Sequence, residues 1–311
     1  RLPRGQPLGG ALSPAHMTCQ RGCANVAPHN GPATGDKRSM SKADRFFQMK
    51  REGKPIAMLT AYDAPSARAQ AAAGVDVILI GDSVGTNMLG YASEREVKLE
   101  DICHHTRAVR RGAPDMFLIS DLPWATYTNE RQAVESARKL VEAGADMVKF
   151  EGALPHILKA LVADGHAVCC HLGLEPQNHE QKRLKGKTAA DARKIVDEAL
   201  LMDAAGQSML VLEVIPEELS QAITMAIKAP TIGIGGGRAT DGQVLVWPDV
   251  LGYTEHNFKH NRRYAEMGRA MFEAASAYVR DVHARQFPGA ENAFHMPKDE
   301  LDIFLAKKPA A

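Results

Sequence analysis

Long hydrophobic runs and an excess of charge of one sign are both missing from this chain of 311 residues. No apolar stretch approaches the roughly 20 residues that a membrane-spanning helix needs, and the chain begins without the apolar core of a signal peptide. Its 38 Lys and Arg residues balance 37 Asp and Glu residues, without a basic block interleaved with aromatic residues. We therefore expect a soluble, cytoplasmic protein that acts on small molecules and binds neither membranes nor nucleic acid.

Cysteine is also scarce, and its spacing argues against a zinc site. The five cysteines are Cys19, Cys23, Cys103, Cys169 and Cys170. They form no CxxC pair with a second Cys or His pair that would complete such a site. Because free cysteines are among the most frequently buried residues, we interpret Cys103, Cys169 and Cys170 as reduced thiols of the core.

The composition of the first 40 residues differs from that of the remainder. Residues 1–40 are rich in Gly, Pro, Ala and His and lack periodicity, which predicts a flexible N-terminal extension. From Ser41, the sequence SKADRFFQMKREG predicts a short amphipathic helix that ends at Gly53. Residues 41–311 suit a single domain, because a barrel of parallel strands and helices needs roughly 250 residues.

Eight short apolar runs follow this helix, separated for the most part by helical stretches. They are nearly continuously apolar rather than alternating, which is typical of parallel strands covered on both faces. Several of the intervening stretches have helical periodicity and end in Gly, such as Asn129–Gly144 and Thr188–Gly206. The apolar runs are Ile56–Thr60, Val75–Ile80, Met116–Ser120, Met147–Phe150, Ala167–Cys170, Met209–Leu212, Thr231–Ile234 and Val244–Trp247.

A weak internal repeat supports the same organisation. AAGVDVILIGD, EAGADMVKFE and DAAGQSMLVLE each place a strand directly after the end of a helix and close it with an acidic residue. Eight such units with right-handed crossovers favour a closed (β/α)8 TIM barrel over a doubly wound sheet. Around Arg238–Gln243 the link is too short for a helix. The helical periodicity of Arg262–Arg285 predicts a C-terminal extension that packs outside the barrel.

Four of the predicted strands end in acidic residues, which a barrel brings to one rim. A single acid in such a place more often caps a helix or faces solvent. Four carboxylates at one rim repel one another unless a cation neutralises them, and a set of oxygen ligands suits Mg²⁺. Asp82 and Asp121 are the candidates for direct ligands, and Glu151 could bind the metal directly or through water. Glu213 is the fourth acid.

Other residues at the strand ends suggest roles beside the acids. Lys149 shares a strand face with Glu151, so it either holds a substrate carboxylate or forms a buried salt bridge. Glu213 is followed by apolar residues, which favours a general base over the alternative of a helix N-cap. His171 is a ligand, a proton carrier or a core histidine. The run TIGIGGG either binds an anion through its backbone or allows a tight turn.

Several longer segments have a distinctive order and spacing. They are LTAYDAPSARAQAAAGVDVILIGDSVG, YASEREVKLEDICHHTRAVRRGAP, ISDLPW, AGADMVKFEG, CHLGLEPQ, LVLEVIP, TIGIGGG, DGQVLVWPDVLG and FPGAENAFH. In order and spacing these segments resemble the motifs of the ketopantoate hydroxymethyltransferase family. The resemblance extends from about Lys54 to His295 and is specific, because the motifs are many, dispersed and collinear.

This resemblance implies a cytoplasmic (β/α)8 enzyme of pantothenate and coenzyme A biosynthesis that assembles into large homo-oligomers, decamers in the family. Such an enzyme transfers a hydroxymethyl group from 5,10-methylenetetrahydrofolate to 3-methyl-2-oxobutanoate and so forms 2-dehydropantoate (ketopantoate). Mg²⁺ is the implied cofactor, and the implied metal-site residues are Asp82, Asp121 and Glu151. The resemblance also assigns proton abstraction to Glu213 and substrate binding to Asp82, Ser83, Asp121, Lys149 and His171.

Two alternative enzymatic interpretations stay open. A Mg²⁺-dependent lyase or mutase of the phosphoenolpyruvate mutase type would also use an enolate, although the catalytic cysteine motif of that group is not evident here. A divergent paralogue with another acceptor is the second alternative, because Trp124 and the basic loop after His171 differ from the family pattern. A non-catalytic paralogue fits less well, since it would have no chemical reason to keep the acids together with Lys149.

Overall fold

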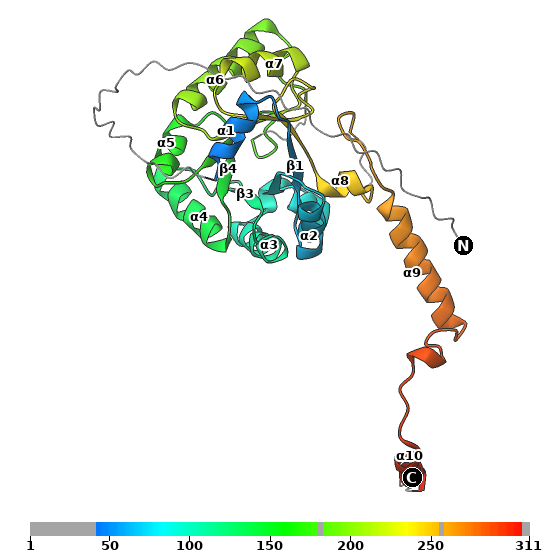
Figure 1. Cartoon of the computed structure of the whole chain (residues 1–311). Coiled ribbons are helices and arrows are strands. Elements are labelled where there is room, and N and C mark those ends of the chain that lie inside the picture. Colours follow the sequence, from blue (N-terminus) through cyan, green and yellow to red (C-terminus); the bar gives the residue numbers. More distant parts are fainter. Residues whose placement is uncertain (1–41, 179–182, 255–257, 307–311) are drawn as a thin grey trace, which may run out of the picture. The chain divides into compact units, whose positions relative to one another are not determined.

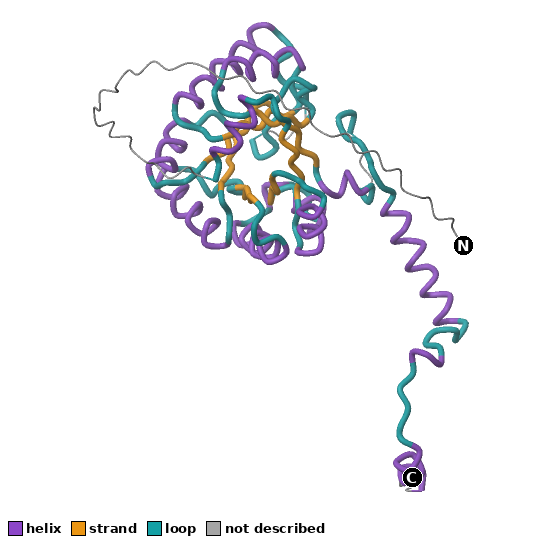
Figure 2. Tube along the Cα trace, in the orientation of Figure 1, coloured by secondary structure: helices purple, strands orange, loops and turns teal. Residues whose placement is uncertain are grey.

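Residues 42–178, 183–254 and 258–306 are described by the computed structural model of the chain. Eight parallel strands, each hydrogen-bonded to the next in chain order, close into a barrel, which confirms the predicted (β/α)8 fold. The strands form a ring that helices surround (Figure 1, Figure 2). They are β1 Ile56–Thr60, β2 Val77–Ile80, β3 Phe117–Asp121, β4 Met147–Glu151, β5 Val168–Gly173, β6 Met209–Glu213, β7 Thr231–Ile234 and β8 Gly242–Leu245.

Local sequence signals set the limits of the helices. The Asn129 side chain accepts a hydrogen bond from Gln132 N at the start of α4, and Gly144 ends that helix in the left-handed conformation. Thr188 caps α6 in the same way. The α-helices are α1 Asp44–Arg51, α2 Ala64–Ala72, α3 Leu99–Gly112, α4 Glu130–Ala143, α5 Pro155–Ala163, α6 Ala189–Ala204, α7 Glu217–Ala226, α8 Trp247–Leu251, α9 Met267–His283 and α10 Lys298–Ala306. The short elements are η1 Gly85–Leu89, η2 Glu94–Glu96 and η3 Ala290–Asn292.

The structure corrects two expectations in the C-terminal part of the chain. The eighth strand is predicted at Val244–Trp247, but it spans Gly242–Leu245, and Trp247 begins α8 because Pro248 favours the first turn of a helix. Residues 235–241, all of them described, contain no helix, as their short length predicts. The C-terminal helix is predicted over Arg262–Arg285, but α9 spans Met267–His283. Neither α9 nor α10 contains a buried residue in the single chain.

Alternation of side chains along the strands separates two hydrophobic clusters. Inside the barrel, Met58 and Val77 pack with Phe46 and Met49 of α1. The rings of Phe46 and Phe117 meet edge to face, with their centroids 4.9 Å apart. On the outer face, strand residues of the opposite parity pack against the surrounding helices. Helix α1 therefore fills the N-terminal end of the barrel and leaves the C-terminal end for a site.

The cysteines of the described region have their predicted state, since Cys103, Cys169 and Cys170 are free and buried. Cys19 and Cys23 lie outside the residues that the structure describes, and so does the predicted extension at residues 1–40. Among the helices of the described ranges, none is long and apolar enough to cross a membrane.

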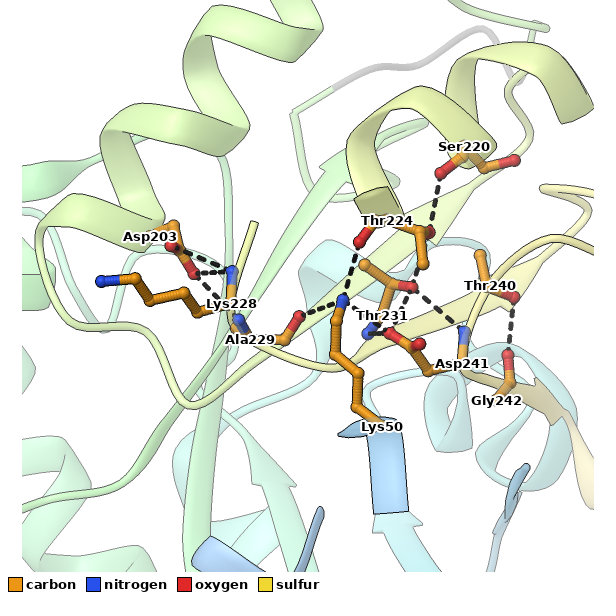
Figure 3. Close-up of polar contacts among 10 residues, drawn as sticks. All are labelled: Lys50, Asp203, Ser220, Thr224, Lys228, Ala229, Thr231, Thr240, Asp241 and Gly242. Atoms are coloured by element: carbon orange, nitrogen blue, oxygen red, sulfur yellow. Dashed lines mark hydrogen bonds and ion pairs between the residues drawn. The ribbon is translucent and has the colours of Figure 1, made fainter. Parts of the chain in front are cut away.

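A polar network at the N-terminal end of the barrel joins α1 to the last two strands (Figure 3). Lys50 Nζ donates to the carbonyl oxygens of Thr224 and Ala229, at 2.8 and 3.1 Å. It also lies 2.9 Å from Asp241 Oδ2. The same oxygen of Asp241 accepts hydrogen bonds from Thr231 N and Oγ1, at 2.8 and 3.0 Å. Since no helix links β7 to β8, this network fastens the two strands to the rest of the barrel at that end.

Lys50→Met tests how much this network contributes to stability. The side chains of Lys50 and Asp241 are only 17% and 14% exposed, so the substitution leaves a poorly solvated carboxylate without its cation. We expect the free energy of unfolding, measured by urea denaturation, to fall by about 3 kcal/mol. The control is Lys42→Met, because Lys42 is 75% exposed in its ion pair with Asp146, and its loss should cost less than about 1 kcal/mol. Equal losses in the two variants would contradict this account.

Candidate active site

A cavity of about 630 Å³ opens at the C-terminal ends of the strands. This is the end of the barrel at which enzymes of this architecture place their catalytic residues. All the site residues that the sequence suggests line this one cavity, although they come from segments far apart in the chain. They are Asp82, Ser83, Asp121, Lys149, Glu151, His171 and Glu213.

The period of two along the strands accounts for this convergence. Met147 belongs to the cluster inside the barrel, and Lys149 and Glu151 follow it at intervals of two residues, so all three face inward. Parallel pairing then aligns Asp121 with Lys149, and Glu151 with His171. Opposite charges on neighbouring strands are thus placed side by side by the register of the sheet.

Lys149 forms a buried ion pair with Asp121 within the group of acids. Its Nζ lies 2.9 Å from Asp121 Oδ1, and Asp121 Oδ2 accepts a hydrogen bond from Asp82 N at 3.0 Å. Burial lowers the pKa of Lys149, but the charges of the three surrounding carboxylates outweigh burial and raise it above its usual value. Lys149 is therefore a charged ammonium group, and its salt bridge belongs to a larger network that faces the cavity.

His171 lies between two acids of the neighbouring strands β4 and β6. Its Nδ1 is 3.4 Å from Glu151 Oε1, and its Nε2 is 3.1 Å from Glu213 Oε2. Burial and the charge of Lys149 lower the pKa of His171, but the contacts with the two carboxylates outweigh them and raise it to about 9. His171 is therefore an imidazolium at neutral pH, and its position between two acids differs from that of an ordinary core histidine.

The surroundings of Glu213 differ from the sequence expectation. The sequence predicts an apolar setting, whereas the imidazole of His171 lies beside the carboxylate because β5 and β6 are paired. The N-cap of α7 is Pro216, so Glu213 does not cap that helix. Val214, the next residue, has φ +47°, a left-handed conformation that is strained for a β-branched side chain. Strain of this kind is concentrated at functional sites.

Asp82 has an unfavourable environment for a negative charge. Burial, followed by repulsion from Asp121 and Glu151, raises the pKa of Asp82 well above its usual value. Among the residues at the strand ends, four carboxylates face one ammonium and one imidazolium, which leaves an excess of two negative charges when all are ionised. A divalent cation in the cavity would balance this excess.

The donor set fits Mg²⁺ in particular. Within the described ranges, no three His, Cys, Asp or Glu side chains are grouped so that all three could hold one metal ion. Mg²⁺ does not require such a group, because it usually binds one or two protein carboxylates and completes its shell with water and substrate oxygens. The candidate ligands Asp82, Asp121 and Glu151 all line the cavity, and Asp82 N lies 3.0 Å from Asp121 Oδ2.

Two polar residues next to the site receive no role from the sequence analysis. Gln177, at the end of the CHLGLEPQ segment, donates one hydrogen bond to Asp82 and another to Glu151. The hydroxyl of Tyr62 lies 2.9 Å from Ser83 Oγ. Both residues follow a strand, but neither is marked by hydrophobic periodicity or by a pattern of charges. Their presence in the family-like segments is the one signal that points to them.

The glycine run after β7 forms a tight turn against neighbouring side chains. Gly235 has φ +68°, and a Cβ at this position would lie 3.2 Å from His260 Cγ. Gly237 has φ +80°, and a Cβ there would lie 2.5 Å from Glu217 Cβ. Of the two interpretations of this run, the geometry therefore supports close packing of the backbone. His260 itself lines the cavity and is not predicted from the sequence.

Comparison with solved structures shows the same barrel in other enzymes. A phosphonopyruvate hydrolase in complex with oxalate and Mg²⁺ has a TM-score of 0.55 and 11% sequence identity, covering 86% of this chain and 96% of that chain. A 2,3-dimethylmalate lyase of the PEP mutase/isocitrate lyase superfamily has a TM-score of 0.53 and 13% identity, covering 86% of this chain and 99% of that chain. At such low identity the similarity shows the fold alone.

Sequence comparison reaches further than the fold. Residues 41–290 match a family model described as ketopantoate hydroxymethyltransferase. The 3-methyl-2-oxobutanoate hydroxymethyltransferase of Geobacillus sp. (strain WCH70) is 44% identical over 263 residues, which cover 82% of this chain and 94% of that protein. Both the extent of the family match and the identity to this relative support one conclusion. The chain belongs to the ketopantoate hydroxymethyltransferase family.

Proposed function

We propose that the protein transfers a hydroxymethyl group from 5,10-methylenetetrahydrofolate to 3-methyl-2-oxobutanoate. The product is 2-dehydropantoate (ketopantoate), a precursor of pantothenate and coenzyme A. The proposal depends on one observation, the gathering of four carboxylates, one ammonium and one imidazolium at the strand ends that line a single cavity of a chain from this family. A 2-oxo acid suits such a set, because its carboxylate requires positive charge and the removal of its C3 proton requires a base.

The excess of buried negative charge supports a magnesium site at Asp82, Asp121 and Glu151. The hydrogen bond of 3.0 Å between Asp82 N and Asp121 Oδ2 brings the first two residues together. Bound there, Mg²⁺ would act as a Lewis acid that increases the acidity of the C3–H bond of the oxo acid. Phosphonopyruvate hydrolase, which has the same fold, is known in complex with oxalate and Mg²⁺.

The residues of the chain divide between binding and proton transfer. Lys149 and Ser83 donate hydrogen bonds to the carboxylate of the oxo acid, and His171 adds positive charge on the same side. Glu213 accepts the proton from C3, and the imidazolium of His171, 3.1 Å away, orients the Glu213 carboxylate for this step. The electron pair left on C3 then forms the bond to the methylene carbon of the folate, and water supplies the hydroxyl group on that carbon. The two bonds from the methylene carbon to the folate nitrogens break, these nitrogens take up the proton held by Glu213 and one proton from the water, and tetrahydrofolate leaves.

Glu213→Gln tests the assignment of the base. The substitution keeps the size of the side chain but removes its ability to accept a proton. We expect deuterium exchange at C3 of 3-methyl-2-oxobutanoate, followed by NMR in D₂O with Mg²⁺, to fall by at least about a hundred-fold. Mg²⁺ binding, measured by calorimetry, should not change. The control is Glu217→Gln, because Glu217 pairs with Arg238 and should not affect exchange. Exchange at the normal rate in Glu213→Gln would remove Glu213 as the base.

The raised pKa of His171 predicts a titration that NMR can follow in the metal-free protein. Its pKa of about 9 in the folded state lies above the ordinary value of 6.5, so the charge on the ring favours folding. This stabilisation is complete below pH 6.5 and is lost as the pH rises through about 9. We expect the ring signals to change near that upper value, and at lower pH in Glu213→Gln. A midpoint near 6.5 in the unmodified protein would contradict the two ion pairs.

The alternative activities have less support. A lyase or mutase of the phosphoenolpyruvate mutase type rests on fold similarity to neighbours that are only 11% and 13% identical. A different acceptor would depend on the loops after the strands. One of these contains the exposed Trp124, and another, after His171, includes residues 179–182 outside the described ranges. The exchange assay with several 2-oxo acids distinguishes these possibilities.

We propose further that the protein assembles with copies of itself, as the family resemblance implies for a decamer. The support comes from the C-terminal helices, in which no residue is buried in the single chain. Phe272 of α9 and Phe304 of α10 are 72% and 61% exposed, in the company of other large apolar side chains. Exposed apolar surface of this extent marks a site of association. We infer that the partner of these helices is a second copy of the chain, because the family resemblance implies a homo-oligomer.

Sedimentation velocity tests this assembly. We expect the unmodified protein to sediment as a species larger than a monomer. The double variant Phe272→Asp with Phe304→Asp should give smaller species, because an aspartate is costly to bury in an apolar interface. The control is Met225→Asp, which replaces an 80% exposed apolar residue of α7 and should leave the size unchanged. A monomeric unmodified protein would contradict the assembly, and an unchanged double variant would exclude these helices from it.

A further inference from the structure

Gln177 is a fully buried residue that lies directly behind the acids of the cavity. It follows Pro176, which lines the cavity, in the segment after β5. The backbone carbonyl of Gln177 accepts a hydrogen bond from Arg95 Nε at 2.7 Å, so this segment is held to η2. A buried amide needs partners for its donors and acceptor, and those of Gln177 come from residues at or after the ends of β2, β3 and β4.

The hydrogen bonds of the Gln177 side chain determine which way its amide faces. Oε1 accepts a hydrogen bond from the Tyr127 hydroxyl at 2.5 Å. Nε2 donates to Asp82 Oδ2 at 2.7 Å and to Leu122 O at 3.1 Å. Rotation of the amide by half a turn would place Oε1 against two acceptors that offer it no proton. The three partners therefore specify a single orientation.

One residue thus donates to two of the three carboxylates proposed to hold the cation. The side-chain amide of Gln177 engages Oδ2 of Asp82, and its backbone N–H engages Oε2 of Glu151 at 2.9 Å. In Asp82 the hydrogen bond to Oδ2 favours binding of a cation or water through Oδ1. In Glu151 the second oxygen, Oε1, lies 3.4 Å from His171 Nδ1, so both oxygens of this carboxylate have a fixed direction. Groups behind a metal ligand orient it in this way, and their loss weakens the site.

We propose that Gln177 is a positioning residue of the cation site, which holds the carboxylates of Asp82 and Glu151 in the orientation that binds Mg²⁺. This inference deepens the proposed function and rests on it for the identity of the cation. Gln177 touches no reacting atom and acts through the two acids. The third carboxylate, that of Asp121, is oriented separately by Lys149 and by the backbone N–H of Asp82.

A second buried glutamine offers a matched control. Gln207 lies just before β6, at the opposite end of the barrel from the cavity. Neither its Oε1 nor its Nε2 has a hydrogen-bond partner within the described part of the chain. Methionine is similar to glutamine in length but has no amide donor or acceptor. Gln177→Met and Gln207→Met therefore make the same chemical change at the two ends of the barrel.

Calorimetric titration of the full chain with Mg²⁺ alone, in the absence of substrate, tests the proposal. We expect the Kd for Mg²⁺ to rise about ten-fold or more in Gln177→Met and to stay at the unmodified value in Gln207→Met. The Mg²⁺ concentration that gives half-maximal deuterium exchange should rise by the same factor. If Gln177 only stabilised the fold, Gln177→Met would lower the melting temperature of the protein without a selective loss of Mg²⁺ affinity. An unchanged Kd in Gln177→Met overturns the proposal.

Tyr127→Phe provides a second variant in case Gln177→Met does not fold. It removes only the hydrogen bond to Oε1 of Gln177, and the loss of that restraint should raise the Kd for Mg²⁺ about five-fold. An unchanged Kd in a folded Tyr127→Phe protein likewise overturns the proposal. The binding measurement does not depend on the reaction. If the unmodified protein binds Mg²⁺ but catalyses no exchange, the proposed function fails, whereas a raised Kd in these variants still supports the positioning role.

Discussion

The ion pair between Lys149 and Asp121 is the interaction on which the C-terminal end of the barrel depends. It places one positive charge among buried carboxylates that would otherwise repel one another in a region of low polarity. His171 has a similar effect between Glu151 and Glu213. These two cations balance only part of the negative charge of the four carboxylates, and the remainder is the charge that the proposed Mg²⁺ would balance. The unbalanced negative charge that makes this end of the barrel costly to fold is therefore the same charge that the proposed cation would neutralise.

The two ends of the barrel contain the same pair of residue types with opposite consequences. At the N-terminal end, Lys50 is surrounded by two carbonyl oxygens and the carboxylate of Asp241, so its charge and its donors are satisfied within the fold. At the C-terminal end, Lys149 meets more carboxylates than it can neutralise. The arrangement around Lys50 stabilises the fold, whereas the arrangement around Lys149 leaves negative charge that a ligand can balance. This separation of stability from chemistry is typical of barrel enzymes.

Much of this arrangement could be predicted from the sequence, because it follows from local periodicity. Continuous apolar runs locate the strands, and alternation directs Lys149 and Glu151 to the same face. The contact between His171 and Glu213 could not be predicted, since it depends on the register of β5 against β6. Gln177 is a loop residue that follows no period, and its partners belong to other strands. The end of β8 was misjudged because the apolar run continues into α8.

Helix α1 has a kinetic consequence for the opposite end of the barrel. Because Phe46 and Met49 fill the interior from the N-terminal side, the described part of the chain leads a molecule at the acids to solvent through the mouth formed by the strand ends. A molecule that binds deep in the cavity must then bind before the molecule that covers it and must dissociate after that molecule. In the proposed reaction an oxo acid bound at the acids would lie deeper than the folate. The oxo acid would then bind first, the folate would bind and leave above it, and the hydroxymethylated product would dissociate last.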